Sequence, residues 1–192
     1  MAEDTYQKEE SRRLFLRKIG LVAGAGFASA LVTPTFAKSK RSDTSGDVAV
    51  MQGALALEHE GIAAYQVAGG SGLLKPPTLK LALLFQGHHK QHRDALADLI
   101  KKAGGNPVAP KTDAEYTKDL NLGSLKSEAD VVALATKLEL GATNAYTGQV
   151  AALRDHQLAH LFTQLATDET VHWATLNNAA GIPIPEKAFL FG

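Results

Sequence analysis

The 192-residue sequence contains no cysteine. This absence excludes disulfide bonds, thiolate metal sites, iron–sulfur clusters and covalently attached c-type haem. The sequence also lacks an excess of charge, with 20 basic and 20 acidic residues. A chain without a basic surface offers nucleic acid no electrostatic footprint, so we expect no nucleic-acid partner. The remaining composition, 45% hydrophobic and 21% charged, is typical of a soluble globular domain with a sizeable core.

Residues 1–37 have the pattern of an export signal. Paired arginines, Arg12 and Arg13, precede a mildly apolar segment that ends in small residues at Ala37. This pattern resembles a bacterial twin-arginine (Tat) signal peptide, which implies passage through the Tat translocon as a folded protein and a periplasmic location. The alternative is an uncleaved signal that anchors the protein in the membrane, because the apolar segment is just long enough to span it. Residues 38–47 are polar and predict a disordered leader.

The rest of the chain predicts an all-α fold. Apolar residues recur at alternating spacings of three and four, which is typical of the buried face of a bundle helix, and no strand pattern is present. Glycines, prolines and capping residues (Ser124 or Ser127, and Asp155) delimit four helices, at about 47–69, 76–103, 127–153 and 155–180. Residues 48–181 therefore predict a four-helix bundle, with residues 182–192 as a C-terminal tail. The long connection between the second and third helices is a crossover that spans the bundle.

Ionisable residues interrupt the apolar faces of these helices. Glu169 and His172 are three residues apart, so they share one helix face with apolar residues on both sides. An uncompensated carboxylate in a bundle core costs several kcal/mol, and a metal ion compensates it most directly. The alternatives are a surface ion pair for this motif and solvated helix faces for the single glutamates. The pattern predicts six metal ligands: Glu58, His89, His92, Glu139, Glu169 and His172.

The two halves of the predicted bundle repeat each other. The ionisable pairs of the second and fourth helices are separated by a constant 80 residues. The first and third helices each carry a Leu-Glu pair followed seven residues after its glutamate by a tyrosine, Tyr65 or Tyr146. We expect both tyrosines to be core aromatics whose hydroxyls find a partner. Together with Asp168, they are placed to orient the metal ligands.

This arrangement resembles the ferritin-like superfamily of di-iron carboxylate proteins. The pattern of that superfamily is one glutamate from each of two helices and Glu-x-x-His from each of the other two. Glu58 and Glu139 match the single glutamates. Glu169 and His172 match one complete motif, and His92 matches the remaining histidine. The sequence is most similar to exported bacterial ferritin-like proteins with a twin-arginine signal. The resemblance implies iron, or another transition metal, bound as one or two ions in the bundle core.

His89 departs from the superfamily pattern, which has a glutamate at this position. A neutral imidazole binds iron, zinc, copper or nickel, but it does not bridge two ions as a carboxylate does. Three carboxylates rather than four would face the metal, so we expect a second ion to bind more weakly. Whether His89 is a ligand or has lost that role stays open. Its neighbour His88 is rotated about 100° around the helix and is expected outside the ligand set.

Three functions fit these patterns. The first is an oxidoreductase in which core iron reacts with oxygen or peroxide in redox or ferroxidase-type chemistry. The second is a metal-binding or storage protein without turnover. The third is a structural bundle that lost its di-metal site through His89. The sequence leaves open whether the protein is an enzyme, which metal and substrate it takes, and whether the chain forms a homodimer.

Overall fold

The computed structural model describes residues 45–191, which contain five α-helices and no β-strand. The predicted signal with Arg12 and Arg13 lies outside the described residues. The all-α prediction is confirmed, and the four long helices are α2 (Ser45–Gly70), α3 (Pro76–Lys102), α5 (Glu128–Gln149) and α6 (His156–Ala179). None of the described helices is both long and apolar enough to cross a membrane.

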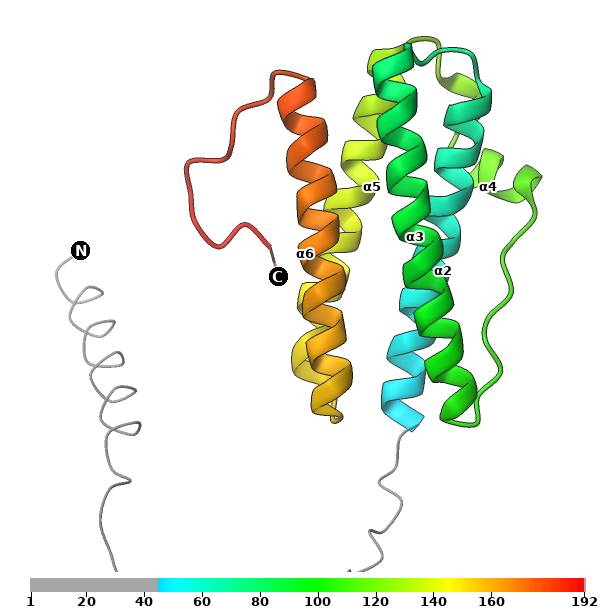
Figure 1. Cartoon of the computed structure of the whole chain (residues 1–192), viewed down its shortest axis with the longest axis vertical. Helices are drawn as coiled ribbons and strands as arrows, with labels where there is room; N and C mark the ends of the chain where they lie inside the picture. Colours follow the sequence, from blue (N-terminus) through cyan, green and yellow to red (C-terminus); the bar gives the residue numbers. More distant parts are fainter. Residues whose placement is uncertain (1–44, 192) are drawn as a thin grey trace, which may run out of the picture. The chain divides into compact units, whose positions relative to one another are not determined.

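The long helices form two antiparallel pairs, α2 with α3 and α5 with α6, and the pairs lie side by side (Figure 1). The crossover returns the chain along the bundle from the end of α3 to the start of α5 (Figure 1). As a result, α5 runs parallel to α3, and α6 runs parallel to α2. This topology turns the ionisable faces of the two halves towards one another.

The crossover contains a short helix that sequence reasoning missed, α4 (Asp113–Asp119). Thr112 and Glu115 form a reciprocal capping box at its start, and Tyr116 is buried against the bundle. The side chain of Gln52 in α2 holds the preceding extended segment through one donated and one accepted backbone hydrogen bond, of 2.6 and 2.8 Å. These contacts fix the crossover along α2. A 3₁₀ turn, η1 (Leu122–Ser124), then leads towards α5.

Polar side chains set the helix ends. The Ser127 hydroxyl caps α5 and the Asp155 carboxylate caps α6. The third helix is shorter than predicted, because α5 ends at Gln149 and a 3₁₀ turn, η2 (Val150–Ala152), follows it. The first helix begins at Ser45, so Asp47 lies in α2 and not in the leader. Its buried carboxylate accepts the backbone N–H groups of two residues in the α5–α6 connection, each at 3.0 Å, which fixes that connection to the start of α2.

Two apolar clusters enclose the middle of the bundle. The larger cluster includes Leu55, Leu96 and Phe162, and the smaller one includes Phe85 and Leu176. In every long helix, the predicted ionisable ligands lie between these two clusters. At the helix ends the buried positions shift by one residue from the strict three-four alternation, because a straight helix with 3.6 residues per turn drifts from a heptad repeat.

The C-terminal tail follows a left-handed glycine, Gly181, with φ of 69°. The tail contains no helix among its described residues. The ring of Phe191 contacts Trp173 of α6 edge to face, with a centroid separation of 5.3 Å. Phe189, by contrast, is fully exposed. One aromatic residue therefore attaches the end of the tail to the bundle.

Candidate metal centre

The six residues predicted as metal ligands lie together at the centre of the bundle. All are buried, with exposures from 0% to 8%. The alternatives of a surface ion pair and of solvated helix faces are therefore wrong for this chain. One glutamate comes from α2, one from α5, two histidines from α3, and the Glu-x-x-His motif from α6: Glu58, Glu139, His89, His92, Glu169 and His172.

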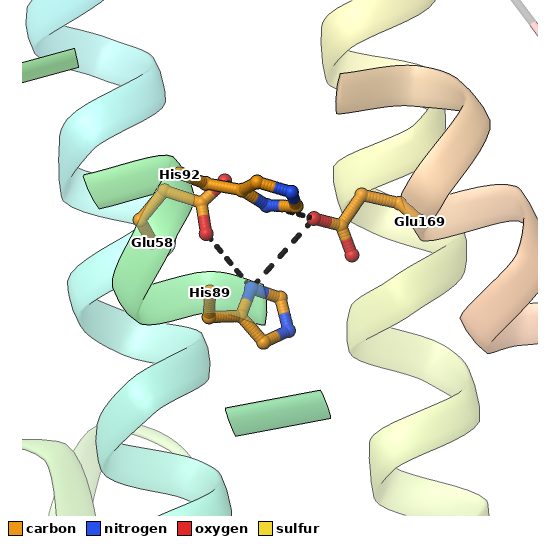
Figure 2. A group of neighbouring side chains, drawn as sticks. All are labelled: Glu58, His89, His92 and Glu169. Carbon is orange, nitrogen blue, oxygen red and sulfur yellow. Dashed lines mark hydrogen bonds and ion pairs between the residues drawn. The ribbon is translucent and has the colours of Figure 1, made fainter. Parts of the chain in front are cut away.

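These side chains form two overlapping groups that could hold a metal ion. The donor atoms within each group all lie within 4.8 Å of one another. His89 and Glu169 belong to both groups. Figure 2 shows the first group, whose side chains converge from helices on both sides of the centre. The groups are Glu58, His89, His92 and Glu169 on one side and His89, Glu139, Glu169 and His172 on the other.

His89 lies inside the centre. Its Nδ1 is 2.8 Å from Oε2 of Glu58, and its Nε2 is 3.4 Å from Oε1 of Glu139. The space for the ring comes from Gly61, where a Cβ atom would lie only 3.1 Å from the imidazole. Sequence reasoning missed Gly61, although an isolated glycine inside a helix, one turn after a candidate ligand, signals a close approach. The ring is therefore buried among carboxylates, with 4% exposure.

Glu169 lies between the two other histidines. Oε1 is 3.1 Å from Nδ1 of His92, and Oε2 is 3.1 Å from Nδ1 of His172. The two oxygens therefore face different groups, which is the placement that a bridging carboxylate needs. Phe85 stacks on the His172 ring with a centroid separation of 4.0 Å and fixes its plane.

The two tyrosines hold the single glutamates across the helix pairs. The hydroxyl of Tyr65 in α2 donates to Glu139 in α5, and the hydroxyl of Tyr146 in α5 donates to Glu58 in α2. The expectation that both hydroxyls find a partner is confirmed. Each bond takes one carboxylate oxygen and orients the other, and together they connect the two halves of the repeat.

Three buried atoms that could bind a metal lack a hydrogen-bond partner among the described residues: Nδ1 of His92, Oε2 of Glu139 and Oε1 of Glu169. The His92 and Glu169 atoms are 3.1 Å apart, but not in hydrogen-bonding geometry. A buried polar atom left unpaired costs about 1–3 kcal/mol. Cations in the two donor groups would together satisfy all three atoms, so the donor set fits metal ions.

Charge in the centre is distributed unevenly. Burial alone would raise the pKa values of Glu58 and Glu139, but the neighbouring histidines outweigh burial and lower both. At Glu169 the effect of burial is larger and raises the pKa. Among residues 45–191, no tyrosine donates a hydrogen bond to Glu169. Burial would also lower the pKa of His92, but Glu169 and Glu58 outweigh it and raise that pKa to about 10. The pKa values of the other two central histidines are raised for the same reason.

Metal binding should therefore release protons. At pH 7 the pKa of His92, about 10, keeps its imidazole protonated in the metal-free protein, whereas a ligand must be neutral. Metal affinity should rise with pH, by about tenfold per unit for each proton released. Calorimetry of Zn²⁺ binding in buffers of different ionisation enthalpy measures the number of protons released per ion bound. His160→Ala removes an exposed histidine and should leave it unchanged. Binding without proton release would contradict the charge distribution.

Residues 46–181 match the sequence profile of the ferritin-like domain family. The chain belongs to this family. Its fold is similar to the crystal structure of a conserved hypothetical protein from Mycobacterium tuberculosis, with 23% sequence identity and a TM-score of 0.62. That similarity covers 77% of this chain and 99% of the other, and at this identity it shows the fold alone. A comparison with curated proteins found no match.

Two further residues of this ferritin-like domain contact the candidate ligands from outside the centre. Oδ2 of Asp168 is 3.2 Å from Nε2 of His92, as expected for a residue that orients a ligand. Nδ1 of His88 is 2.9 Å from Nε2 of His172. His88 lies outside both donor groups, as predicted, but its contact with α6 was not predicted.

Proposed function

We propose that this ferritin-like protein binds iron in the bundle core and uses it in redox or ferroxidase-type chemistry with oxygen or peroxide. The main support for this proposal is the pair of donor groups that share Glu169 and His89. Three buried atoms in these groups have no hydrogen-bond partner among the described residues. Carboxylate and imidazole ligands from four helices suit iron. Iron held there would supply the electrons for reduction of the oxidant.

The residues around the iron would have separate roles. Glu58, Glu139 and Glu169 would compensate the positive charge of the metal, and the histidines would supply nitrogen ligands. The tyrosine hydroxyls would hold the single glutamates in place during changes of charge. The two apolar clusters exclude water from both ends of the centre.

A small cavity beside the centre supports the proposal that the oxidant is a small molecule. Its volume is about 30 Å³, and its lining includes Leu57, Glu60, Gly61, His89 and Glu139. A space of this size accommodates a molecule such as dioxygen or peroxide. Because the cavity borders both His89 and Glu139, a ligand in it would reach the donor groups directly.

Oxygen consumption by anaerobically prepared protein loaded with Fe²⁺ tests this proposal. We expect consumption to exceed that of the same Fe²⁺ concentration in buffer, and Glu139→Ala to remove most of the excess. Glu128→Ala is a matched control, because that glutamate lies at the start of α5, pairs with Lys75 and belongs to neither donor group. Tight iron binding without oxygen consumption would favour the second function, metal binding or storage without turnover. This alternative draws support from His89, whose imidazole replaces a bridging carboxylate.

We also propose that the protein is exported to the periplasm by the Tat translocon. The support is the pair Arg12 and Arg13 before the apolar segment. Arg12→Lys combined with Arg13→Lys should leave the precursor in the cytoplasm, because the translocon requires the paired guanidinium groups. Fractionation of cells followed by immunoblotting measures the distribution. Unchanged periplasmic accumulation of the double variant would remove the basis of this proposal.

A further inference from the structure

The two donor groups are matched in their ligands. Each has one glutamate and one histidine of its own, Glu58 with His92 or Glu139 with His172. Both groups share His89 and Glu169, so the number and type of donor atoms do not distinguish them.

The groups differ in the residue that contacts the outer ring nitrogen of each group's own histidine. In each of these rings Nδ1 faces the shared Glu169, and Nε2 points away from the centre. Nε2 of His92 lies 3.2 Å from the Asp168 carboxylate, whereas Nε2 of His172 lies 2.9 Å from the His88 imidazole. Asp168 and His88 are themselves 80 residues apart, and each directly precedes one of the shared residues. The repeat therefore extends to these outer partners, and each contacts the histidine of the opposite half.

The two partners do not act alike on a metal ligand. A neutral histidine that offers Nδ1 to a metal carries its proton on Nε2 and donates it outward. A carboxylate that accepts this hydrogen bond makes the imidazole a stronger ligand, and loss of such a partner weakens metal affinity about 10–100-fold. An uncharged imidazole in the same place accepts the hydrogen bond without contributing negative charge. His92 therefore has the stronger support.

We propose that Asp168 and His88 make the two metal positions unequal, so that the position formed with Glu58 and His92 binds its ion more tightly. This inference rests on the proposed metal binding and adds which position fills first. Asp168 and His88 are positioning residues in this account, because they act through His92 and His172.

Titration of the full protein with Co²⁺, followed by its absorption bands, tests the order of filling. In the wild type we expect one tight ion and one weaker ion. Glu139→Ala should keep the tight ion, whereas Glu58→Ala should lose it and retain only the weaker one. If both variants lose affinity equally, or the order is the reverse, the inference is wrong although metal binding stands. If the wild type binds no Co²⁺ at all, the proposed function fails with it.

An exchange of the two outer residues provides a matched control. The double variant His88→Asp with Asp168→His has the same composition and net charge as the wild type. In this background Glu58→Ala should keep the tight ion and Glu139→Ala should lose it, a reversal that a purely structural role would not produce. The single change His88→Asp should strengthen the weaker position about 10–100-fold, and Asp168→Asn should weaken the tight one similarly. Unchanged affinities in both single variants would overturn the inference even if the exchanged protein does not fold.

Discussion

Replacement of His89 by glutamate should raise the number of tightly bound ions per chain from one towards two. Two divalent ions roughly 3.5–4 Å apart repel each other and rely on bridging carboxylates to coexist. The imidazole of His89 occupies the place between Glu58 and Glu139 where the family pattern has such a carboxylate. A glutamate there supplies the missing negative charge, so iron-dependent oxygen consumption should increase with stoichiometry. Equilibrium titration with Fe²⁺ under anaerobic conditions measures the number of ions.

The same substitution should destabilise the metal-free protein. In the wild type, the His89 imidazole compensates the negative charge of the buried carboxylates of Glu58 and Glu139. Removal of one partner of a buried ion pair lowers the free energy of unfolding by about 3–5 kcal/mol. His89→Gln is the matched control, because it has the size of glutamate without its charge. It should destabilise the metal-free protein without raising the stoichiometry. Two tight ions in the wild type would show that the charge argument is wrong and that His89 is itself a terminal ligand.

Glu169→Ala should abolish metal binding at both positions. Glu169 is fully buried and belongs to both donor groups, whereas Glu58 and Glu139 each belong to one. Since loss of a hydrogen-bond partner behind a ligand already costs about 10–100-fold, loss of a shared ligand should lower affinity by more than about 100-fold. Metal content after dialysis, measured by elemental analysis, gives the first readout. Glu186→Ala, on the exposed tail, is the control and should retain the wild-type content.

Thermal unfolding gives a second readout for this substitution. An ion at about 100 times its dissociation constant stabilises the folded state by about 2.7 kcal/mol, so the wild type should melt higher with metal than without. Glu169→Ala should show no such increase. Circular dichroism establishes that the variant is folded before the comparison. A metal-dependent increase in melting temperature equal to that of the wild type would place the ion elsewhere in the protein.

Much of the fold and of the candidate ligand set follows from the sequence, because charged side chains in an apolar helix face have few physical solutions. Glu58 and Glu139 occupy matching positions in the two halves, as do the pairs His89–His92 and Glu169–His172. The structure brings all six residues together at less than 10% exposure. The helix caps at Ser127 and Asp155 were also predictable, since each precedes a periodic apolar segment.

Other features depend on contacts between helices that a single sequence does not encode locally. Helical periodicity places His88 outside the buried face of α3, but its side chain extends far enough to contact His172 in α6. The role of Gly61 appears only once the His89 ring is placed against it. The short helix α4 is different, because the Thr112–Glu115 capping box is visible in the sequence and could have been found there.

The metal content of the full protein, purified from the cells that make it, is the most direct test of the claim that the bundle core binds iron. Elemental analysis after removal of loosely bound ions gives the metal and its ratio to protein. Buried carboxylates and histidines from four helices predict iron, at about one tightly bound ion per chain and its loss in Glu169→Ala. Protein that contains no metal, and takes none up when Fe²⁺ is supplied, would contradict the claim and leave a structural bundle whose buried charges are balanced by its own histidines.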